Sequence, residues 1–271
     1  MPLSPASHRL GVLGWPVRHS RSPAMHRAAI AALGLDGWSY QLLPVPPELF
    51  TETVRALRAA GFVGANVTVP HKPAALALAD TATAAARAIG AANTLTLAPE
   101  GGIAASNTDA PGLIAALGLD PAGCSAVVLG AGGTARAAVW ALREAGADVA
   151  VWSRNPDRAR GLADAMGVAA IARPRRADLL VNATTVGMDR HMSRCDALTS
   201  LALDSDLLRG YAHVVDFVYT SGATPLVRAA RSLGVATVDG LAILVAQGAL
   251  SFERWTGIPA PIPAMARAAR D

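Results

Sequence analysis

From residue 127 to residue 136 the chain reads VVLGAGGTAR, an apolar run that leads into the pattern Gly-x-Gly-x-x-Ala. A helix-forming run follows directly, and a second apolar run begins at Asp148 and ends at Trp152. The order of strand, glycine turn, helix and strand is typical of a Rossmann-type dinucleotide-binding domain. These residues therefore predict an α/β fold with a parallel sheet in this part of the chain.

Each position of the glycine turn has a physical task. Gly130 permits the tight turn, Gly132 lets the backbone approach a pyrophosphate, and the small Ala135 lets helix and strand pack closely. The N-terminus of the following helix supplies a site for the anion. The alternative is a glycine turn that binds no ligand, and the flanking strands and helix disfavour it. The cofactor is expected to contact Gly130, Ala131, Gly132, Gly133, Thr134 and Ala135.

The residues after the second strand indicate which dinucleotide is bound. A domain that binds NAD usually carries an acid roughly 20 residues beyond the glycines, where it accepts from the ribose 2′-hydroxyl. Here residues 153–158 read SRNPDR, with no acid directly at the strand end. The guanidinium groups of Arg154 and Arg158 suit a 2′-phosphate, and ordinary exposed arginines are the alternative. Asp157 is expected to cap the next helix. We therefore predict NADP, held at this end by Ser153, Arg154 and Arg158.

A basic side chain closes another short apolar run at residues 66–72, which read NVTVPHK. Because Pro70 cuts the strand off, Lys72 is expected to be held at the strand end, where an amine can polarise a carbonyl or move a proton. Further along, Asp109 opens a predicted helix that extends to Leu117, and its carboxylate can keep the lysine charged and oriented. The alternatives are a solvated lysine and a helix-capping aspartate. We interpret Lys72 and Asp109 as a catalytic pair.

Several short motifs occur in order along nearly the whole chain. They are the glycine turn and residues 19–23, 66–72, 90–94, 107–109, 182–188, 216–219, 224–226 and 239–247. Through these motifs the chain resembles the shikimate dehydrogenase family, and so many ordered matches are more specific than any single motif. The resemblance implies the reversible reduction of 3-dehydroshikimate to shikimate with NADPH, in the chorismate pathway to the aromatic amino acids.

The resemblance also implies a substrate site of small polar side chains. Ser20 and Ser22 would hold the substrate carboxylate, with Tyr219 nearby. The ring hydroxyls and the ketone would be surrounded by Thr68, Lys72, Asn93, Asp109 and Gln247. A small polyhydroxylated anion needs several neutral donors and acceptors and one cation, which this set supplies. Ser22 has a second interpretation, since serine followed by proline is also typical of a helix N-cap.

Two segments depart from the family pattern. Ser153 and Asn155 stand where the family commonly has Asn and Thr, which alters the expected adenosine pocket. Residues 189–196 lack the usual proline-rich pattern, so the loop expected beside the nicotinamide differs. Thr184 and Gly240, which lie in two of the matching motifs, complete the expected cofactor site.

Apolar and helical runs alternate in both halves of the chain, which predicts mainly parallel sheets covered on both faces. Strands are expected at residues 10–13, 38–43, 62–69, 127–129, 148–152, 179–181 and 214–216. Helices are expected at 23–33, 47–60, 109–117, 137–146, 239–255, where Asp239 is the cap, and 261–270. By resemblance the last helices return to the first domain. The expected domains are a substrate-binding domain of residues 1–106 and 240–271 and an NADP-binding Rossmann domain of residues 107–239, with a cleft between them.

Composition argues against nucleic-acid and membrane proteins. The 271 residues are 52% hydrophobic, which allows one or two substantial cores. A net charge of +4 with a pI of about 9.7 suits anionic small molecules and does not require nucleic acid. The apolar run at 241–250 is too short to span a bilayer. Residues 1–5 contain two prolines and no apolar core, so no signal peptide is expected.

Cysteine and histidine residues give no metal or disulfide pattern. Cys124 and Cys195 lack a paired spacing, which favours a reduced, cytoplasmic protein. His191 and Cys195 are too few ligands for a metal site and are expected in a surface loop. His26 and His71 are expected to be packing or surface residues.

Two alternative functions stay open. One is a quinate/shikimate dehydrogenase with a broader choice of ring or cofactor. The other is a nucleotide-sensing homologue without turnover, and the catalytic pair argues against it. The expected partners are small molecules, shikimate or 3-dehydroshikimate, and a homodimer is one option for assembly.

Overall fold

The computed structural model describes residues 8–189 and 191–271, so the expectation for residues 1–5 lies outside the described residues. The chain forms two compact units. Unit 1 contains the residues up to Thr108 together with Val245–Asp271, and unit 2 contains Asp109–Leu244. Within the described residues, each unit is built on one six-stranded sheet.

The sheet of unit 1 has the strand order β2-β1-β3-β5-β6-β4. Its strands are β1 (His8–Gly14), β2 (Trp38–Pro44), β3 (Phe62–Val67), β4 (Thr81–Ala82), β5 (Thr94–Leu97) and β6 (Ile103–Ser106). β1 pairs in parallel with β2 and β3, which confirms the three strands expected here. β5 runs antiparallel to β3 and β6. The sequence interpretation missed β4, β5 and β6 because runs of two to four residues are too short to show a period.

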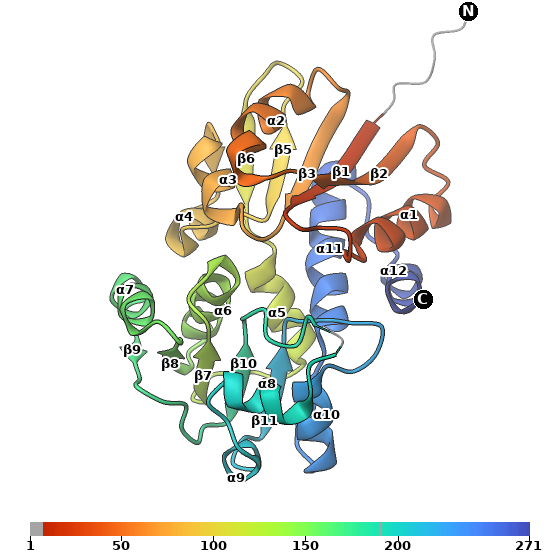
Figure 1. Cartoon of the computed structure of the whole chain (residues 1–271). Coiled ribbons are helices and arrows are strands. Elements are labelled where there is room, and N and C mark those ends of the chain that lie inside the picture. Colours follow the sequence, from red (N-terminus) through yellow and green to blue (C-terminus); the bar gives the residue numbers. More distant parts are fainter. Residues whose placement is uncertain (1–7, 190) are drawn as a thin grey trace, which may run out of the picture. The chain divides into compact units, whose positions relative to one another are not determined.

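Helices cover both faces of the sheet in unit 1. They are α1 (Ser22–Ala32), α2 (Phe50–Leu57), α3 (Lys72–Leu78), α4 (Ala84–Ile89), α12 (Ile262–Arg270) and, from Val245 onward, α11 (Gly240–Thr256). One face packs on α2 through Phe50 and Val54. The opposite face packs on α1 and α11 through Ile30 and Trp255. Figure 1 shows α1 and α12 side by side. The helix expected at 47–60 begins as a 3-10 turn at Pro47–Leu49 before α2.

The sheet of unit 2 has the order β12-β11-β10-β7-β8-β9, and its adjacent strands all pair in parallel. Its strands are β7 (Ser125–Leu129), β8 (Asp148–Trp152), β9 (Ala169–Ala170), β10 (Leu179–Asn182), β11 (His213–Asp216) and β12 (Ala236–Val238). The strands expected at 127–129, 148–152, 179–181 and 214–216 are therefore confirmed. Together with unit 1, this confirms the predicted α/β class with mainly parallel sheets.

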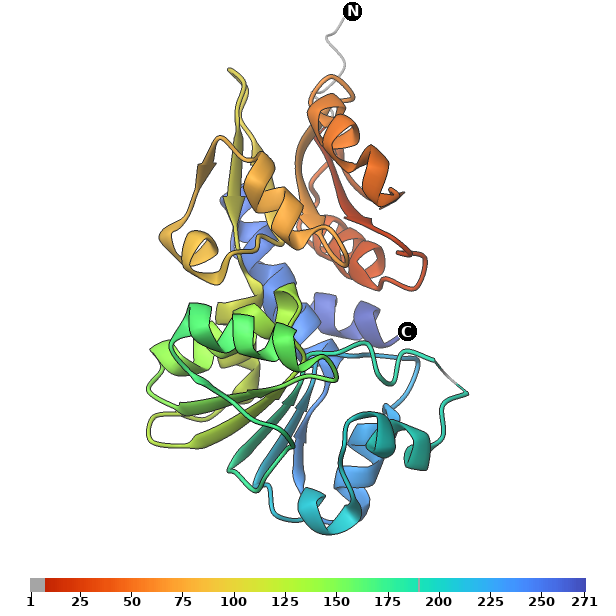
Figure 2. The ribbon, with the colours of Figure 1, turned by 60° about the vertical axis from the view of Figure 1, so that its left-hand side comes forward.

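Helices also lie on both faces of the sheet in unit 2 (Figure 2). They are α5 (Asp109–Leu117), α6 (Gly133–Glu144), α7 (Pro156–Met166), α8 (Arg194–Ser200), α9 (Ser205–Leu208) and α10 (Pro225–Ser232). The green helices α6 and α7 lie along one face in Figure 2, and the teal and blue helices α8, α9 and α10 lie along the other. On that second face, Leu198 of α8 and Leu226 of α10 pack in one core with Leu180 of β10. The expected helices at 109–117 and 137–146 are confirmed, and the second begins earlier than expected, at Gly133.

On one face of the sheet in unit 1, Gly64 of β3 lies in close contact with Trp255 of α11. The indole Nε1–H of Trp255 donates to the carbonyl oxygen of Leu95 at 3.0 Å. A Cβ atom added to Gly64 of β3 would lie 2.2 Å from that nitrogen. Gly64→Ala is expected to lower the free energy of unfolding by about 1–3 kcal/mol, because the packed indole must shift. Urea denaturation followed by circular dichroism measures this change.

Gly161 of α7 provides the matched control. An added Cβ there meets no atom within 4 Å, and its backbone is not in the left-handed region. Gly161→Ala is expected to keep or raise the free energy of unfolding, by up to about 1 kcal/mol, because alanine favours the helix. Equal destabilisation by the two substitutions would contradict the importance of the Gly64 contact.

Candidate active site

Gly130 and Gly132, in the turn after β7, differ in whether the surrounding protein leaves room for a side chain. Gly130 has a φ of +119°, and its added Cβ would lie 3.0 Å from the carbonyl oxygen of Ala183. Glycine is therefore required there by the protein itself. Gly132, the N-cap of α6, has a φ of −88° and no atom within 4 Å of an added Cβ. Nothing within unit 2 demands a glycine at 132, so the open space fits a ligand that approaches the backbone. Ala135 is fully buried, as close packing of helix and strand requires.

The N-terminus of the 12-residue helix α6 completes this part of the site. Gly133 and Thr134 form its first turn, where the backbone N–H groups point toward an anion. The residues present therefore fit a pyrophosphate. Gly130, Ala131 and Gly132 lie in the loop between β7 and α6, and Gly133, Thr134 and Ala135 lie at the start of α6, where the sequence interpretation expected the cofactor.

The helix α7, which follows β8, has a different N-cap from the one expected. Asn155, not Asp157, caps α7, because its side-chain oxygen accepts from the N–H groups of Asp157 and Arg158 at 3.0 and 3.2 Å. Asp157 already lies inside the helix, where it pairs with Arg160. The prediction that Asp157 is the cap was therefore wrong.

The two arginines expected at the 2′-phosphate are exposed. In the described part of the chain, neither Arg154 nor Arg158 pairs its guanidinium with a carboxylate. Ser153 lies beside them, and its hydroxyl oxygen accepts from the N–H of Asn155 at 3.3 Å. Two unneutralised guanidinium groups next to a helix N-terminus suit an anion of high charge.

A buried carboxyl group holds the loops that follow β10 and β11. Asp216 at the end of β11 accepts from the side-chain amide of Asn182 at 2.9 Å and from the N–H of Val218 at 3.0 Å. Asn182 in turn accepts from the hydroxyl of Thr184 at 2.7 Å. Thr184 and Tyr219, both predicted site residues, therefore follow two strand ends that are tied together. Carboxyl ends of parallel strands are where open α/β sheets bind ligands.

Gly240, the remaining predicted cofactor residue, begins α11. An added Cβ there would lie 2.5 Å from the carbonyl oxygen of Val218, so the close approach of the two backbones requires glycine. The side chain of Asp239 accepts from the N–H of Ala242 at 3.0 Å, which confirms the predicted helix cap. Within unit 2 the segment before Tyr219 is thus packed on the start of α11.

In unit 1 the structure places Lys72 in a helix and not at the end of a strand. The strand β3 ends at Val67, and Lys72 is the first residue of α3, not the end of a strand. A turn intervenes, in which the N–H of His71 donates to the carbonyl oxygen of Thr68 at 2.9 Å. Lys72 is 7% exposed, so the alternative of a solvated lysine is wrong. The carbonyl oxygen of Lys72 accepts from the N–H of Ala92 at 2.9 Å, which holds the lysine backbone beside the segment of Asn93.

Lys72 also stands out in a way that the sequence interpretation overlooked. It is the only lysine of the chain, and the other 23 basic side chains are arginine. A guanidinium group keeps its proton under all physiological conditions, whereas an amine can release and regain one. The single position where this chain uses lysine is therefore the position where proton transfer was predicted.

Two predicted substrate residues meet inside unit 1. The side-chain amide of Asn93 donates to Gln247 Oε1 at 3.2 Å. Both side chains are buried, and Asn66, Thr94, Thr108 and Ser251 surround them with further hydrogen bonds. The sequence interpretation included none of Asn66, Thr94, Thr108 and Ser251 among the site residues. Two signals were available, a polar Asn66 within a buried apolar strand and Ser251 four residues after Gln247 on a helix.

Ser20 and Ser22 lie together at the start of α1. The N–H of Ser22 donates to the hydroxyl oxygen of Ser20 at 3.3 Å. Ser22 is the first helical residue and Arg21 occupies the cap position without a side-chain bond, so the interpretation of Ser22 as N-cap was wrong. Thr68 follows β3 and is tied to β1, since its N–H donates to the carbonyl oxygen of Leu13 at 2.8 Å.

His26 and His71 have packing roles. His26 is fully buried and stacks on Tyr40 with 4.2 Å between ring centroids. Burial lowers the pKa of His26 to about 3, because an imidazolium loses its hydration there. His71 stacks on Phe50, and its Nε2 lies 2.7 Å from the carbonyl oxygen of Val45.

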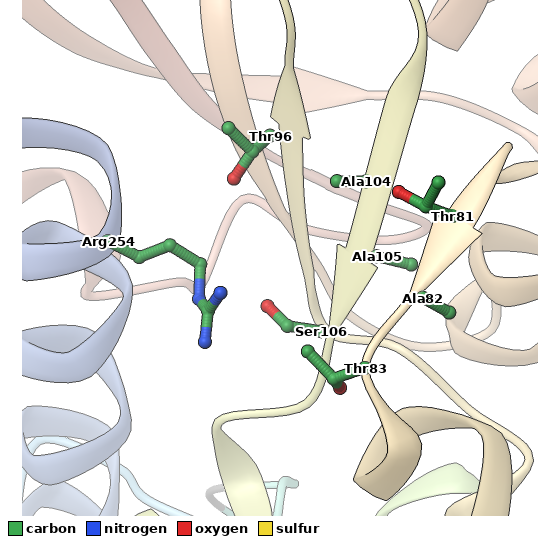
Figure 3. Close-up of a pocket in the computed structure, with 8 residues that line it drawn as sticks. All are labelled: Thr81, Ala82, Thr83, Thr96, Ala104, Ala105, Ser106 and Arg254. Atoms are coloured by element: carbon green, nitrogen blue, oxygen red, sulfur yellow. The ribbon is translucent and has the colours of Figure 1, made fainter.

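A cavity of about 240 Å³ lies beside β4, β5 and β6 in unit 1 (Figure 3). Its lining contains no residue predicted for the site, although Thr96 and Arg254 follow Thr94 and Ser251 on the same elements. The lining residues are Thr81, Ala82, Thr83, Thr96, Ala104, Ala105, Ser106 and Arg254.

Across residues 8–189 and 191–271, no group of three or more His, Cys, Asp or Glu side chains is arranged for a metal ion. No helix in the described ranges is long and apolar enough to cross a membrane. Cys124 and Cys195 are free thiols, and Cys195 lies in α8 and not in a loop.

The buried Asp216 gives a prediction for the dependence of stability on pH. Burial raises the pKa of its carboxyl to about 7, and this outweighs the hydrogen bonds from Thr224, Val218 and Asn182, which lower it. An unfolded aspartate has a pKa of about 3.9, so between roughly pH 4 and pH 7 the folded chain binds more protons. This group's contribution to stability is therefore present at low pH and is lost as pH rises through 7.

Asp216→Asn is expected to remove that contribution, since an amide does not titrate. As pH rises from about 5 to 8, the melting temperature of the parent protein should fall relative to that of the variant. Differential scanning calorimetry across this range measures the difference. A difference that is constant with pH would contradict the raised pKa.

Comparisons with known proteins place the chain in a family. Residues 12–95 match the model of the shikimate dehydrogenase substrate binding domain, and residues 240–270 match that of the shikimate 5'-dehydrogenase C-terminal domain. The shikimate dehydrogenase (NADP(+)) of Methylobacterium radiotolerans is 45% identical over 272 residues, which cover 94% of this chain and 93% of that protein.

Solved structures agree with the sequence comparison. Shikimate 5-dehydrogenase from Thermus thermophilus in complex with NADP(H) and shikimate matches with a TM-score of 0.85 and 42% identity, covering 97% of this chain and 98% of that one. Shikimate dehydrogenase from Aquifex aeolicus matches with a TM-score of 0.89 and 31% identity, covering 99% and 100%. With the glycine turn, the buried lysine and near-complete coverage in agreement, the chain belongs to the shikimate dehydrogenase family.

Proposed function

We propose that this chain catalyses the reversible NADPH-dependent reduction of 3-dehydroshikimate to shikimate, a step of aromatic amino acid biosynthesis. The observation that carries the proposal is the 42% identity, over 97% of the chain, to an enzyme whose structure contains NADP(H) and shikimate. The open space at Gly132 supports the cofactor independently of that similarity. On this basis unit 2 binds NADP and unit 1 binds the substrate, with domain boundaries near residues 106 and 239.

The proposed roles of the side chains follow from their chemistry. When bound, NADPH supplies the hydride that reduces a ketone. Lys72 would give a proton from Nζ to the ketone oxygen as the alcohol forms and take it back in the reverse direction. Asp109 would keep this amine charged and oriented. The substrate's carboxylate and ring hydroxyls would be bound by Ser20, Ser22, Thr68, Asn93, Tyr219 and Gln247.

An assay with purified protein tests the function. Shikimate or quinate is mixed with NADP or NAD, and the absorbance of reduced nicotinamide is followed. Shikimate with NADP is expected to react fastest. Quinate should be used at least about tenfold less efficiently, because its extra hydroxyl would be buried unpaired near the carboxylate site. Comparable kcat/KM for quinate would favour the broader quinate/shikimate enzyme, and no turnover of either acid would favour a nucleotide-sensing protein.

Location and assembly are part of the proposal. Two free cysteines favour a reducing compartment, so we place the protein in the cytoplasm. A homodimer remains a prediction, and sedimentation of the purified protein tests it.

The first functional prediction concerns the choice of cofactor. Replacing both Arg154 and Arg158 with alanine should remove a preference for NADP over NAD of about 1–3 kcal/mol, because the 2′-phosphate loses charge-assisted hydrogen bonds. Arg160→Ala is the matched control, since Arg160 is equally exposed on α7 but already pairs with Asp157. Steady-state kinetics with both cofactors measure the preference, and equal efficiencies in the unmodified protein would contradict the assignment.

The second functional prediction concerns Gly132. Gly132→Ala should leave the melting temperature nearly unchanged, because its Cβ has open space, yet weaken NADP binding at least about tenfold by intruding on the pyrophosphate. Calorimetric titration with NADP measures the affinity. Unchanged NADP affinity would show that this glycine serves the turn alone.

The third functional prediction concerns Lys72. Lys72→Ala should lower kcat by about 10²–10⁴ while the Kd for NADP stays nearly the same, and the loss should not add to that of Asp109→Ala. Because Lys72 is the only lysine, amine-directed labelling reaches just this side chain and the N-terminus. Shikimate should slow the labelling of Lys72 and leave that of the N-terminus unaffected. Turnover within a few-fold of the parent would contradict the catalytic role.

A further inference from the structure

The buried hydrogen bonds around Asn93 fix which end of its amide faces where. The backbone N–H of Thr108 donates to Asn93 Oδ1 at 2.7 Å. A backbone N–H can only donate, so the atom that it meets must be the oxygen. Asn93 Nδ2 then points to Thr108 Oγ1 at 3.0 Å and to Gln247 Oε1 at 3.2 Å.

The same logic sets the orientation of Gln247. Its Oε1 receives the amide of Asn93 and lies 3.4 Å from the hydroxyl of Thr108. The oxygen end of Gln247 therefore faces the interior of unit 1, and the NH2 end faces away from Asn93.

Ser251 lies at the centre of this arrangement. Its hydroxyl is fully buried and lies within 2.9 Å of both Asn66 Nδ2 and Thr94 Oγ1, and 3.1 Å from Thr108 Oγ1. It also donates to the carbonyl oxygen of Gln247, one turn earlier in α11, at 3.1 Å. One hydroxyl group thus joins β3, β5, the end of β6 and α11.

Asn66 extends the cluster to the second strand. Its Oδ1 accepts from the hydroxyl of Tyr40 at 2.8 Å, so its Nδ2 is the end that faces Ser251. The other contacts of that Nδ2, to Asn93 and Thr94, are longer at 3.3 Å. Removing the hydroxyl of Ser251 would leave the buried amide of Asn66 with only these long contacts.

We propose that Ser251 is a positioning residue for the substrate site, which acts through Thr108 and the backbone of α11 to hold the side-chain amide of Gln247 in the orientation that binds the substrate. The inference rests on the proposed function, which makes Asn93 and Gln247 substrate contacts. Ser251 itself acts through these residues and through Thr94 and Thr108. Loss of the Ser251 hydroxyl should weaken the binding of the substrate and leave the binding of the cofactor unchanged.

A double-mutant cycle tests the proposal. Ser251→Ala should raise the KM and the Kd for shikimate roughly fivefold to a hundredfold, the range expected when a buried polar group loses its partner, with an unchanged Kd for NADP. In a Gln247→Ala background the same change should alter both values less than about twofold, because the group that Ser251 positions is gone. A merely structural role would give equal effects in both backgrounds and would overturn the proposal.

Ser232→Ala is the matched control. Ser232 of α10 is exposed, and its hydroxyl also donates to a carbonyl oxygen of its own helix, that of Ala229 at 2.8 Å, but it belongs to unit 2. It should change neither the KM nor the Kd for shikimate. An effect of Ser232→Ala as large as that of Ser251→Ala would overturn the proposal, since any helix hydroxyl would then suffice.

A second pair of variants covers the case in which Ser251→Ala does not fold. Thr94→Val removes a hydroxyl from the cluster and keeps the shape of the side chain. Thr96→Val is its control, because it removes a hydroxyl two residues further along β5, at the cavity of Figure 3 and outside the cluster. Only Thr94→Val should raise the Kd for shikimate, again with little effect in the Gln247→Ala background. Equal effects of the two valines would overturn the proposal. Failure of the unmodified protein to bind or turn over shikimate would instead contradict the proposed function, and with it this inference.

Discussion

The hydrogen bond from the backbone of Thr108 to Asn93 Oδ1 is the interaction on which the polar interior of unit 1 depends. At 2.7 Å between buried atoms, it allows only one orientation of the amide. A buried polar group without a partner costs free energy, so each neighbour must then turn to match. The orientation is passed on to Gln247, and Asn66 and Ser251 complete the set. A polar interior of this kind costs hydrophobic stabilisation and allows only one arrangement of these side chains.

In unit 2 a buried carboxyl group holds neighbouring residues in the same way. Asp216 lies at a strand end, fully buried, and accepts from Asn182 and Val218. Its hydrogen bonds hold two consecutive loops, and burial raises its pKa toward neutrality. The loops that carry Thr184 and Tyr219 are therefore fixed by one carboxyl group. Parallel strands leave their loops at one edge, and this network gives the edge a defined shape.

The chain uses its two types of basic side chain, arginine and lysine, in different places. Arginine serves wherever charge alone is needed, as on the exposed start of α7. Lysine occurs once, buried at the first turn of α3. An amine differs from a guanidinium mainly in being able to release a proton, and a reductase that forms a hydroxyl group needs such a donor. The composition of the chain and the burial of this side chain thus point to the same chemistry.

The sequence by itself determined the α/β class, the Rossmann turn and the long helices, because glycine conformations and hydrophobic periods act locally. The family was also evident from motif order, and so were the residues expected at the site. Only the tertiary structure decided that Lys72 begins a helix, that Asn155 and not Asp157 caps α7, and that Arg21 precedes α1 as its cap. It alone brought Ser251 to Asn66, because residues 185 positions apart meet only when a helix packs on a sheet. Local patterns record which backbone shape a residue prefers, and hydrogen bonds between distant side chains leave no period in the sequence.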